Sequence, residues 1–180
     1  YTVFGTLLLL EKLGLGANFD QINSAVSELD ANSESIKISS IEIAEKIHGS
    51  IPVIFTADFL EGNAHIIRNQ LNETSKTFSS FSAIPELNHH LMEGLKYPKD
   101  KKLIILFLES ELYSPIIKRR FELTKDVISK NQIEFASFRP QGSTKLSQVL
   151  NTLSFGGYIT FYLGILYNED PSLIPWVDYF

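Results

Sequence analysis

Residues 103–108 read Leu-Ile-Ile-Leu-Phe-Leu, an unbroken apolar run without a charge or a turn former. A strand buried on both faces of a parallel sheet has this composition, because both rows of its side chains contact apolar neighbours. Residues 51–55, Ile-Pro-Val-Ile-Phe, form a second short run that is also largely apolar. The two runs predict a mostly parallel sheet with helices on both faces.

The segments around these runs alternate between strand and helix patterns. From residue 51 onward we expect, in order, a strand at 51–55, a helix from 58 to about 71, strands at 78–83 and 103–108, a helix opened by Ser114-Pro115, a strand at 133–138 and a helix at 143–168. This order predicts an α/β fold with an open sheet. Ligands bind such sheets at the carboxyl ends of the strands. The loops expected to line that crevice follow Phe55, Ala83, Leu108 and Phe138.

Helical patterns fill the first 48 residues. Residues 2–14 are apolar on nearly all sides, which predicts a buried helix that ends near Gly14. A second helix is expected from the caps Asn18 and Asp20, and a third from about Ser40 to His48. We therefore divide the chain into a helical segment, 1–48, and an α/β domain, 49–180.

Composition excludes several classes of protein. The chain has 180 residues, which suits one domain, and its 44% apolar residues suffice for a core. A net charge of −5 argues against a general nucleic-acid binder, although a local basic pocket can still hold a small anion. The absence of cysteine excludes disulfides and thiolate metal sites.

One uncharged stretch, between Lys145 and Glu169, raises the question of a membrane span. Its apolar part, 155–167, is shorter than the ~20 residues that a span needs, so we expect a buried helix and no membrane contact. The N-terminus shows no signal peptide, which favours the cytoplasm. Because the chain begins with Tyr1 and its only methionine is Met92, we expect a fragment or a processed product.

Polar side chains that can do chemistry gather in residues 65–92. Glu73 follows a predicted helix, and the adjacent His89 and His90 follow a predicted strand. A carboxylate and an imidazole on neighbouring loops are the usual groups of proton-transfer catalysis. An exposed glutamate with no role is the more common state of such a residue, so both interpretations stay open. Because adjacent histidines seldom bind one ion together, and no His-x-x-x-His pair occurs, we expect no metal site.

Two ordered motifs resemble the bifunctional phosphoglucose/phosphomannose isomerase family, whose members contain two sugar isomerase (SIS) domains. Residues 68–76, Arg-Asn-Gln-Leu-Asn-Glu-Thr-Ser-Lys, are similar to the family's Gln-x-Asn-Glu-Asn-x-Lys, and residues 85–89, Pro-Glu-Leu-Asn-His, to its Pro-Glu-Leu-Asn-His-Asn. The chain departs from the family at Thr74 and His90, where the family usually has asparagine. The likeness continues in the segments 49–54 and 162–171.

The resemblance implies the C-terminal SIS domain of this family, a flavodoxin-like three-layer sandwich, preceded by helices that lead from an N-terminal SIS domain. It implies aldose–ketose isomerisation of glucose 6-phosphate or mannose 6-phosphate to fructose 6-phosphate through a cis-enediol, without a cofactor. Glu73 would be the base and His89 the residue that helps to open the sugar ring. Arg68 and either Thr160 or Ser172 would bind substrate.

The resemblance also implies a homodimer, because the family's histidine reaches the active site from the partner subunit. The family's phosphate loop and enediol-polarising arginine have no counterpart here, and its late lysine falls near or beyond Phe180. The isolated chain is therefore expected to be inactive. The alternative is a non-catalytic SIS domain that binds a sugar phosphate and regulates a partner. Glu73 favours the enzyme, since binding alone does not need a base.

Overall fold

The fold is built on one four-stranded sheet, seen in a computed structural model that describes residues 2–16 and 18–180. The strands lie in the order β2-β1-β3-β4 and every neighbouring pair is parallel. Their bounds are Ile51–Ala57 for β1, Ser80–Ile84 for β2, Leu103–Leu108 for β3 and Glu134–Phe138 for β4. The sheet confirms the predicted strands and their parallel arrangement.

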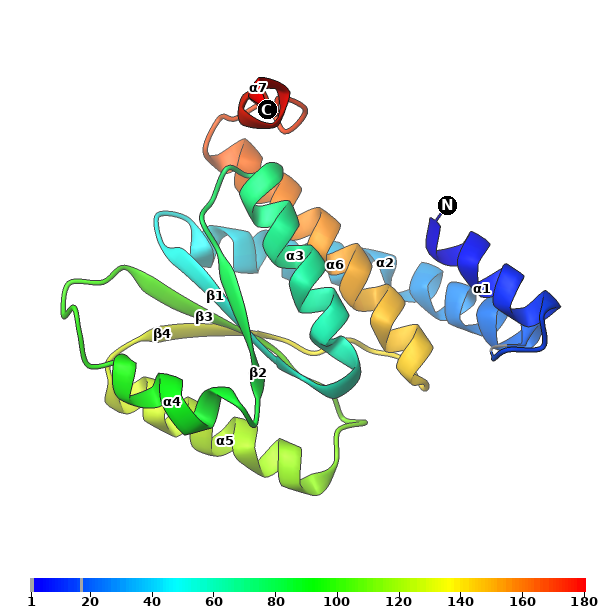
Figure 1. The fold of residues 1–180 in the computed structure, drawn as a ribbon, viewed down its shortest axis with the longest axis horizontal. Helices are drawn as coiled ribbons and strands as arrows, with labels where there is room; N and C mark the ends of the chain where they lie inside the picture. Colours follow the sequence, from blue (N-terminus) through cyan, green and yellow to red (C-terminus); the bar gives the residue numbers. More distant parts are fainter. Residues whose placement is uncertain (1, 17) are drawn as a thin grey trace.

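Helices cover both faces of this sheet (Figure 1). One layer holds α2 (Phe19–Ile47), α3 (Glu61–Glu73) and α6 (Lys145–Leu166), which pack on one another and on the sheet. The opposite layer holds α4 (Leu87–Gly94) and α5 (Pro115–Lys130). A short 3-10 turn, η1 (Asp58–Leu60), links β1 to α3. The three layers confirm the predicted α/β class.

The core lies on both faces of β1 and β3. Ile54 and Phe55 of β1 are fully buried, as are Leu106 and Phe107 of β3. The rings of Phe55 and Phe107 meet edge to face with their centroids 5.6 Å apart. Burial on both faces is the reason that these two strands are apolar almost throughout.

The N-terminus of α5 agrees with its sequence signal. Ser114 is the N-cap, and its hydroxyl accepts a hydrogen bond from the amide of Ile117 at 3.3 Å. Pro115 occupies the first turn, where its missing N–H leaves no helical bond unmade. Thr144 caps α6 in the same way through the amide of Ser147.

The expectation of separate second and third helices was wrong, because α2 runs without a break from Phe19 to Ile47. Asn18 is its N-cap, as predicted, and accepts from the amide of Gln21 at 2.8 Å. Residues 30–39 weaken the apolar pattern, but they contain neither glycine nor proline. Packing of α2 along α6, with Ile36 buried between the expected helices, keeps this stretch helical.

The expectation that residues 2–14 form a buried helix was also wrong. Helix α1 (Thr2–Lys12) packs mainly on α2 and lies away from the sheet (Figure 1). Leu9 keeps 57% of its surface exposed and Leu13, just beyond the helix, keeps 61%. A helix that is apolar on all sides needs neighbouring residues that bury its side chains. The face of α1 that carries Leu9 has no such neighbours within the part of the chain that the structure describes.

Helix α6 is long and apolar enough to cross a membrane by length and composition alone. Half of its most apolar window is nevertheless buried inside the fold, with Phe155, Ile159 and Leu163 fully enclosed. These side chains pack into the core beside the sheet, as expected for a buried helix. The last helix, α7 (Pro175–Tyr179), is short and exposed.

Candidate active site

Glu73 is the last residue of α3 and lies beside a cavity of about 460 Å³. The cavity is lined from two parts of the chain, by Asn72, Glu73 and Lys76 and by residues of the C-terminal segment 169–177. The Glu73 side chain is exposed, and its carboxylate has no hydrogen bond or ion pair within the described residues. A carboxylate in this state is free to act on a ligand in the cavity.

The C-terminal segment is attached directly to the turn that follows Glu73. The Lys76 ammonium donates hydrogen bonds to the backbone carbonyls of Glu73 and Leu173, which joins the two walls of the cavity. Lys76 itself has a φ of 54°, in the left-handed region, where a turn replaces the helix. Helix α6 passes directly beside this turn, because a Cβ added at Gly164 would lie in ordinary van der Waals contact, 3.4 Å from the Thr74 carbonyl oxygen.

Ser172 lies in this C-terminal segment, whereas Thr160 is inside the fold. The amide and hydroxyl of Ser172 both donate to Asp170 Oδ1, at 2.9 and 2.7 Å, and these bonds lower the pKa of the Asp170 carboxyl. Thr160 is 1% exposed and its hydroxyl donates to the Gly156 carbonyl at 2.8 Å. Of the two, Ser172 is exposed and directly precedes Leu173, which lines the cavity, although Ser172 itself is not a lining residue.

Arg68 lies on α3, five residues before Glu73, and does not line the Glu73 cavity. Its guanidinium lies over the ring of Phe81 on β2, with 5.8 Å from the guanidinium carbon to the ring centroid. The side chain is half-buried, and its Nε is enclosed without a hydrogen-bond partner among the described residues. The structure thus places Arg68 at the edge of the sheet rather than beside Glu73.

His89 lines a different cavity, of about 310 Å³, together with Pro85, Glu86, Asn88 and Arg120. It belongs to the first turn of α4, and its side chain is exposed without a partner in the described part of the chain. His90 differs, because its Nε2 lies 3.6 Å from Glu86 Oε1. Of the two histidines, His89 is the one that lines this cavity.

The structure does not bring Glu73 and His89 together, and the expectation that they occupy neighbouring loops was wrong. Strand β2 runs between them, so that Glu73 precedes its amino end and His89 follows its carboxyl end. A five-residue strand alone spans about 16 Å. Figure 1 shows the end of α3 and the start of α4 on opposite sides of the sheet.

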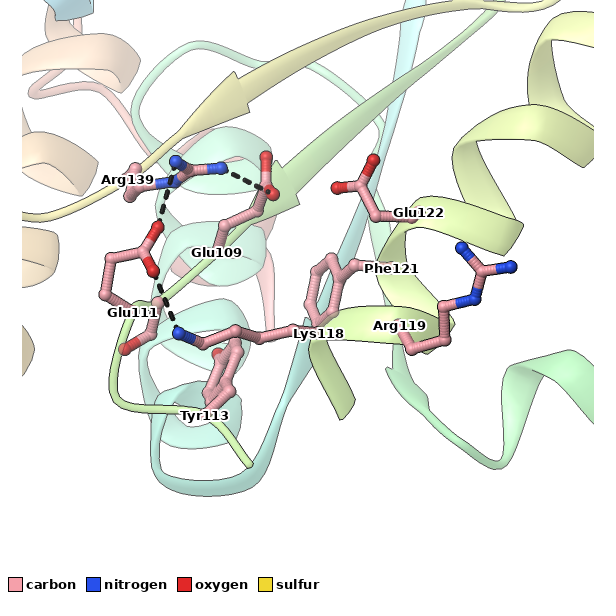
Figure 2. A pocket seen from close by; sticks show the side chains of 9 residues that line it. Glu109, Glu111, Tyr113, Lys118, Arg119, Phe121, Glu122 and Arg139 are labelled. Atoms are coloured by element: carbon pink, nitrogen blue, oxygen red, sulfur yellow. Dashed lines mark hydrogen bonds and ion pairs between the residues drawn. The ribbon is translucent and has the colours of Figure 1, made fainter. Parts of the chain in front are cut away.

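A third cavity, of about 200 Å³, lies at the carboxyl ends of β3 and β4, where the sequence predicted a ligand crevice. Apart from Arg119, the charged side chains that line it are held in ion pairs. Arg139 bridges Glu109 at 3.2 Å and Glu111 at 3.0 Å, and Lys118 contacts Glu111 at 2.9 Å (Figure 2). Lys125 binds Glu109 from α5 at 2.8 Å.

Glu109 is the buried centre of this network, and sequence reasoning missed it. Burial acts to raise its pKa, but hydrogen bonds and charge from Lys125, Ser137 and Arg139 outweigh that effect and hold the pKa below its usual value. Glu109 and Arg139 directly follow their strands, and this position was the available signal. Mutual pairing favours a structural role over ligand binding for this cavity.

No group of three or more His, Asp and Glu side chains is arranged to hold a metal ion in residues 2–16 and 18–180. The chemistry that the exposed groups allow is proton transfer, from Glu73 at one end of β2 and from His89 at the other. Each of the two side chains lines its own cavity.

Comparison with known proteins gives a consistent result. Residues 36–180 match the family described as bacterial phospho-glucose isomerase C-terminal SIS domain. The chain is 28% identical over 165 residues to the bifunctional phosphoglucose/phosphomannose isomerase of Aquifex aeolicus, a match that covers 91% of this chain and 52% of that protein. The protein of the same name from Caldicellulosiruptor bescii is 26% identical over 194 residues, with 99% and 56% covered. The chain thus spans about half the length of these relatives.

Solved structures show the same fold at low sequence identity. A glucose-6-phosphate isomerase-like protein from Thermus thermophilus superposes with a TM-score of 0.68 at 16% identity, covering 91% of this chain and 55% of that one. Glucosamine-6-phosphate deaminase from Thermotoga maritima gives a TM-score of 0.62 at 16% identity, with 93% and 50% covered. At these identities the likeness concerns the fold alone.

Proposed function

The chain belongs to the bacterial phospho-glucose isomerase C-terminal SIS domain family, and from this premise we propose that it is the C-terminal half of a sugar-phosphate isomerase. The reaction is the interconversion of glucose 6-phosphate or mannose 6-phosphate with fructose 6-phosphate through a cis-enediol. Residues 49–180 form the C-terminal SIS domain, and the helical segment 1–48 leads into it from an N-terminal SIS domain. The location is the cytoplasm.

The observation that carries this proposal is the unpaired carboxylate of Glu73 beside the largest cavity described above. The reaction needs one base that removes the proton from C2 and returns it to C1, while a proton moves between the oxygens O1 and O2. A positioned carboxylate contributes about 10²–10⁴-fold to such a step. A domain that only binds sugar phosphate has no use for a base at this place.

Ser172 is proposed to bind substrate near Glu73, and Arg68 is proposed to bind substrate at the β2 edge of the sheet. Ser172 is favoured over Thr160, because the Thr160 hydroxyl is buried and already donates within α6. Arg68 reaches substrate only at the β2 edge, since it does not line the Glu73 cavity. The C-terminal segment otherwise lines the cavity with Glu169 and with apolar side chains, among them Leu173 and Trp176.

His89 is proposed to open the sugar ring in the active site of a second subunit. An imidazole can exchange protons with the ring oxygen near neutral pH. Because β2 separates Glu73 from His89 within one chain, the two can meet at one sugar only if His89 comes from a partner. This separation supports a homodimer with a shared active site, and a chain that lacks the phosphate loop is expected to be inactive alone.

The test is Glu73→Gln in the complete protein that carries this chain, with Glu61→Gln on the same helix as control. Glutamine keeps the shape and removes the basicity, so turnover should fall by at least about 10²-fold while substrate binding persists. Glu61→Gln should leave turnover near that of the unmodified protein. Near-normal turnover in Glu73→Gln would show that Glu73 is not the catalytic base. A wild-type protein that binds sugar phosphate without isomerising it would favour the non-catalytic, regulatory alternative.

A further inference from the structure

Two consecutive arginines on α5 face two different cavities. Arg119 lines the charged cavity at the ends of β3 and β4, whereas Arg120 lines the cavity of His89. Consecutive residues of an α-helix point about 100° apart, which accounts for the difference. In Figure 2 the Arg119 side chain points away from the Glu111–Lys118 pair. The chain therefore offers two chemically identical side chains, of which one accompanies His89.

Arg120 is exposed, and its guanidinium forms no ion pair within the described residues. Lys118, Lys125 and Lys130 of α5 and the neighbouring Arg139 are held in ion pairs, whereas Arg119, like Arg120, has none within the described residues. Glu86 lines the same cavity as Arg120, but no ion pair joins the two among the described residues, and Glu86 Oε1 lies 3.6 Å from His90 Nε2. The Arg120 guanidinium is thus free to bind an anion that enters beside His89.

A chain of hydrogen bonds fixes α4, which carries His89, to the turn that carries Arg120. The Asn88 side-chain amide donates to the Thr124 hydroxyl at 2.7 Å. That hydroxyl donates in turn to the backbone carbonyl of Arg120 at 2.8 Å. Thr124 is 1% exposed, so water does not compete for these bonds. His89 follows Asn88 directly, and its position relative to Arg120 is set by these contacts.

The geometry of the substrate explains why an arginine beside His89 can reach its phosphate. In a 6-phosphorylated pyranose, only C5, C6 and O6 stand between the ring oxygen and the phosphorus. A cation placed next to the residue that acts on the ring oxygen is therefore within reach of the phosphate. Guanidinium is well suited to this contact, because its planar N–H groups match phosphate oxygens two at a time.

Resting on the proposed function, we propose that Arg120 is a further phosphate-binding residue, additional to the phosphate loop expected of the N-terminal SIS domain, that this chain delivers, together with His89, to the active site of the partner subunit. Arg120 contacts the 6-phosphate while His89 acts on the ring oxygen. The contact is the same before and during proton transfer, since the phosphate does not react. Arg120 therefore contributes to substrate affinity and not to the chemical step.

The test compares Arg120→Gln with Arg119→Gln in the complete protein. Loss of one charged hydrogen-bonding group should raise KM for the sugar phosphate by about 10- to 100-fold with kcat nearly unchanged. The inhibition constant of inorganic phosphate, used as a competitive inhibitor, should rise by a similar factor. A purely structural role of Arg120 would not produce that rise. Arg119→Gln should leave KM and the inhibition constant unchanged, and Arg120→Lys should recover part of the affinity.

The outcomes separate this proposal from the proposed function. If Glu73→Gln abolishes turnover but Arg120→Gln matches Arg119→Gln in KM and in phosphate inhibition, Arg120 does not bind phosphate and the isomerase stands. If Arg120→Gln lowers kcat with KM unchanged, its role is not the one proposed. If the wild-type protein does not isomerise, titration with sugar phosphate still compares the two variants, and equal affinities contradict the proposal.

Discussion

Two carboxylates at opposite ends of the sheet, Glu109 and Glu73, are in opposite states. At the carboxyl ends of β3 and β4, Glu109 is 6% exposed and is bound by both Lys125 and Arg139. At the amino end, Glu73 is exposed and its carboxylate has no partner among the described residues. A carboxylate whose charge is satisfied inside the chain stabilises the fold, whereas an unsatisfied one is available to a substrate.

The largest expected effect on stability concerns the paired end. Glu109→Gln removes the charge that Lys125 and Arg139 share, and should lower the free energy of unfolding by about 2–3 kcal/mol. Glu111→Gln is the control, because that carboxylate is exposed and solvent screens its ion pairs. Urea unfolding of both variants at pH 7 measures the difference. Equal free energies of unfolding for the two variants would show that the ion pairs of Glu109 do not stabilise this end of the sheet.

Close helix packing, rather than ion pairing, holds the end that carries Glu73. A Cβ added at Gly156 of α6 would lie 2.5 Å from Ile67 Cγ1 and 3.1 Å from Gln70 Oε1 of α3. Gly156→Ala should therefore destabilise the fold by about 1–3 kcal/mol.

The adjacent Gly157 is the matched control, since nothing lies within 4 Å of its added Cβ. Gly157→Ala should be neutral or stabilise the helix by up to about 1 kcal/mol. Thermal unfolding of the two variants decides the point. If Gly156→Ala were as stable as Gly157→Ala, α3 would not depend on this close approach.

The pH dependence of stability sharpens the comparison further. The pKa of Glu109 is lowered in the folded state from its usual value of 4.5. Its stabilisation is therefore present above pH 4.5 and is lost as the pH falls through the folded-state pKa. Acid should thus reduce the stability of the wild-type protein more steeply than that of Glu109→Gln. Parallel curves for the two proteins between pH 7 and acid would show that Glu109 keeps an ordinary pKa.

The smallest expected effects are those of removing the hydroxyl groups of Ser172 and Thr160, which should differ in whether stability or KM changes. Thr160→Ala removes a buried hydrogen bond and should cost about 1 kcal/mol of stability with substrate affinity unchanged. Ser172→Ala should leave stability near that of the wild-type protein and raise KM severalfold. Unfolding and steady-state kinetics on the complete protein measure both. A raised KM in Thr160→Ala alone would reverse the choice between them.

Local composition was sufficient to predict the scaffold. Residues 103–108 and 51–55 are apolar on both faces because the strands are covered on both sides, and that requirement is visible in the sequence. The extent of α2 was not predictable from its pattern, since packing on α6 keeps a polar stretch helical. The exposure of α1 depends on which neighbours the fold supplies, and periodicity carries no information about neighbours.

The arrangement of the site was less predictable than its residues. Glu73 and His89 stand out as polar groups between apolar segments, but chain order does not show that β2 carries the second to the opposite end of the sheet. Glu109 and Arg139 are 30 residues apart and meet because β3 and β4 are parallel neighbours. Long-range pairing of this kind follows from strand order, which the sequence pattern left open.

The central claim is that Glu73 and His89 of one chain serve two different active sites. It is tested most directly by co-expressing Glu73→Gln and His89→Ala subunits of the complete protein, with different affinity tags, and by assaying the purified mixed dimers. Each mixed dimer should contain one site with both functional groups, so activity should return although each parent is nearly inactive. Mixed dimers as inactive as their parents would show that both groups act within one subunit.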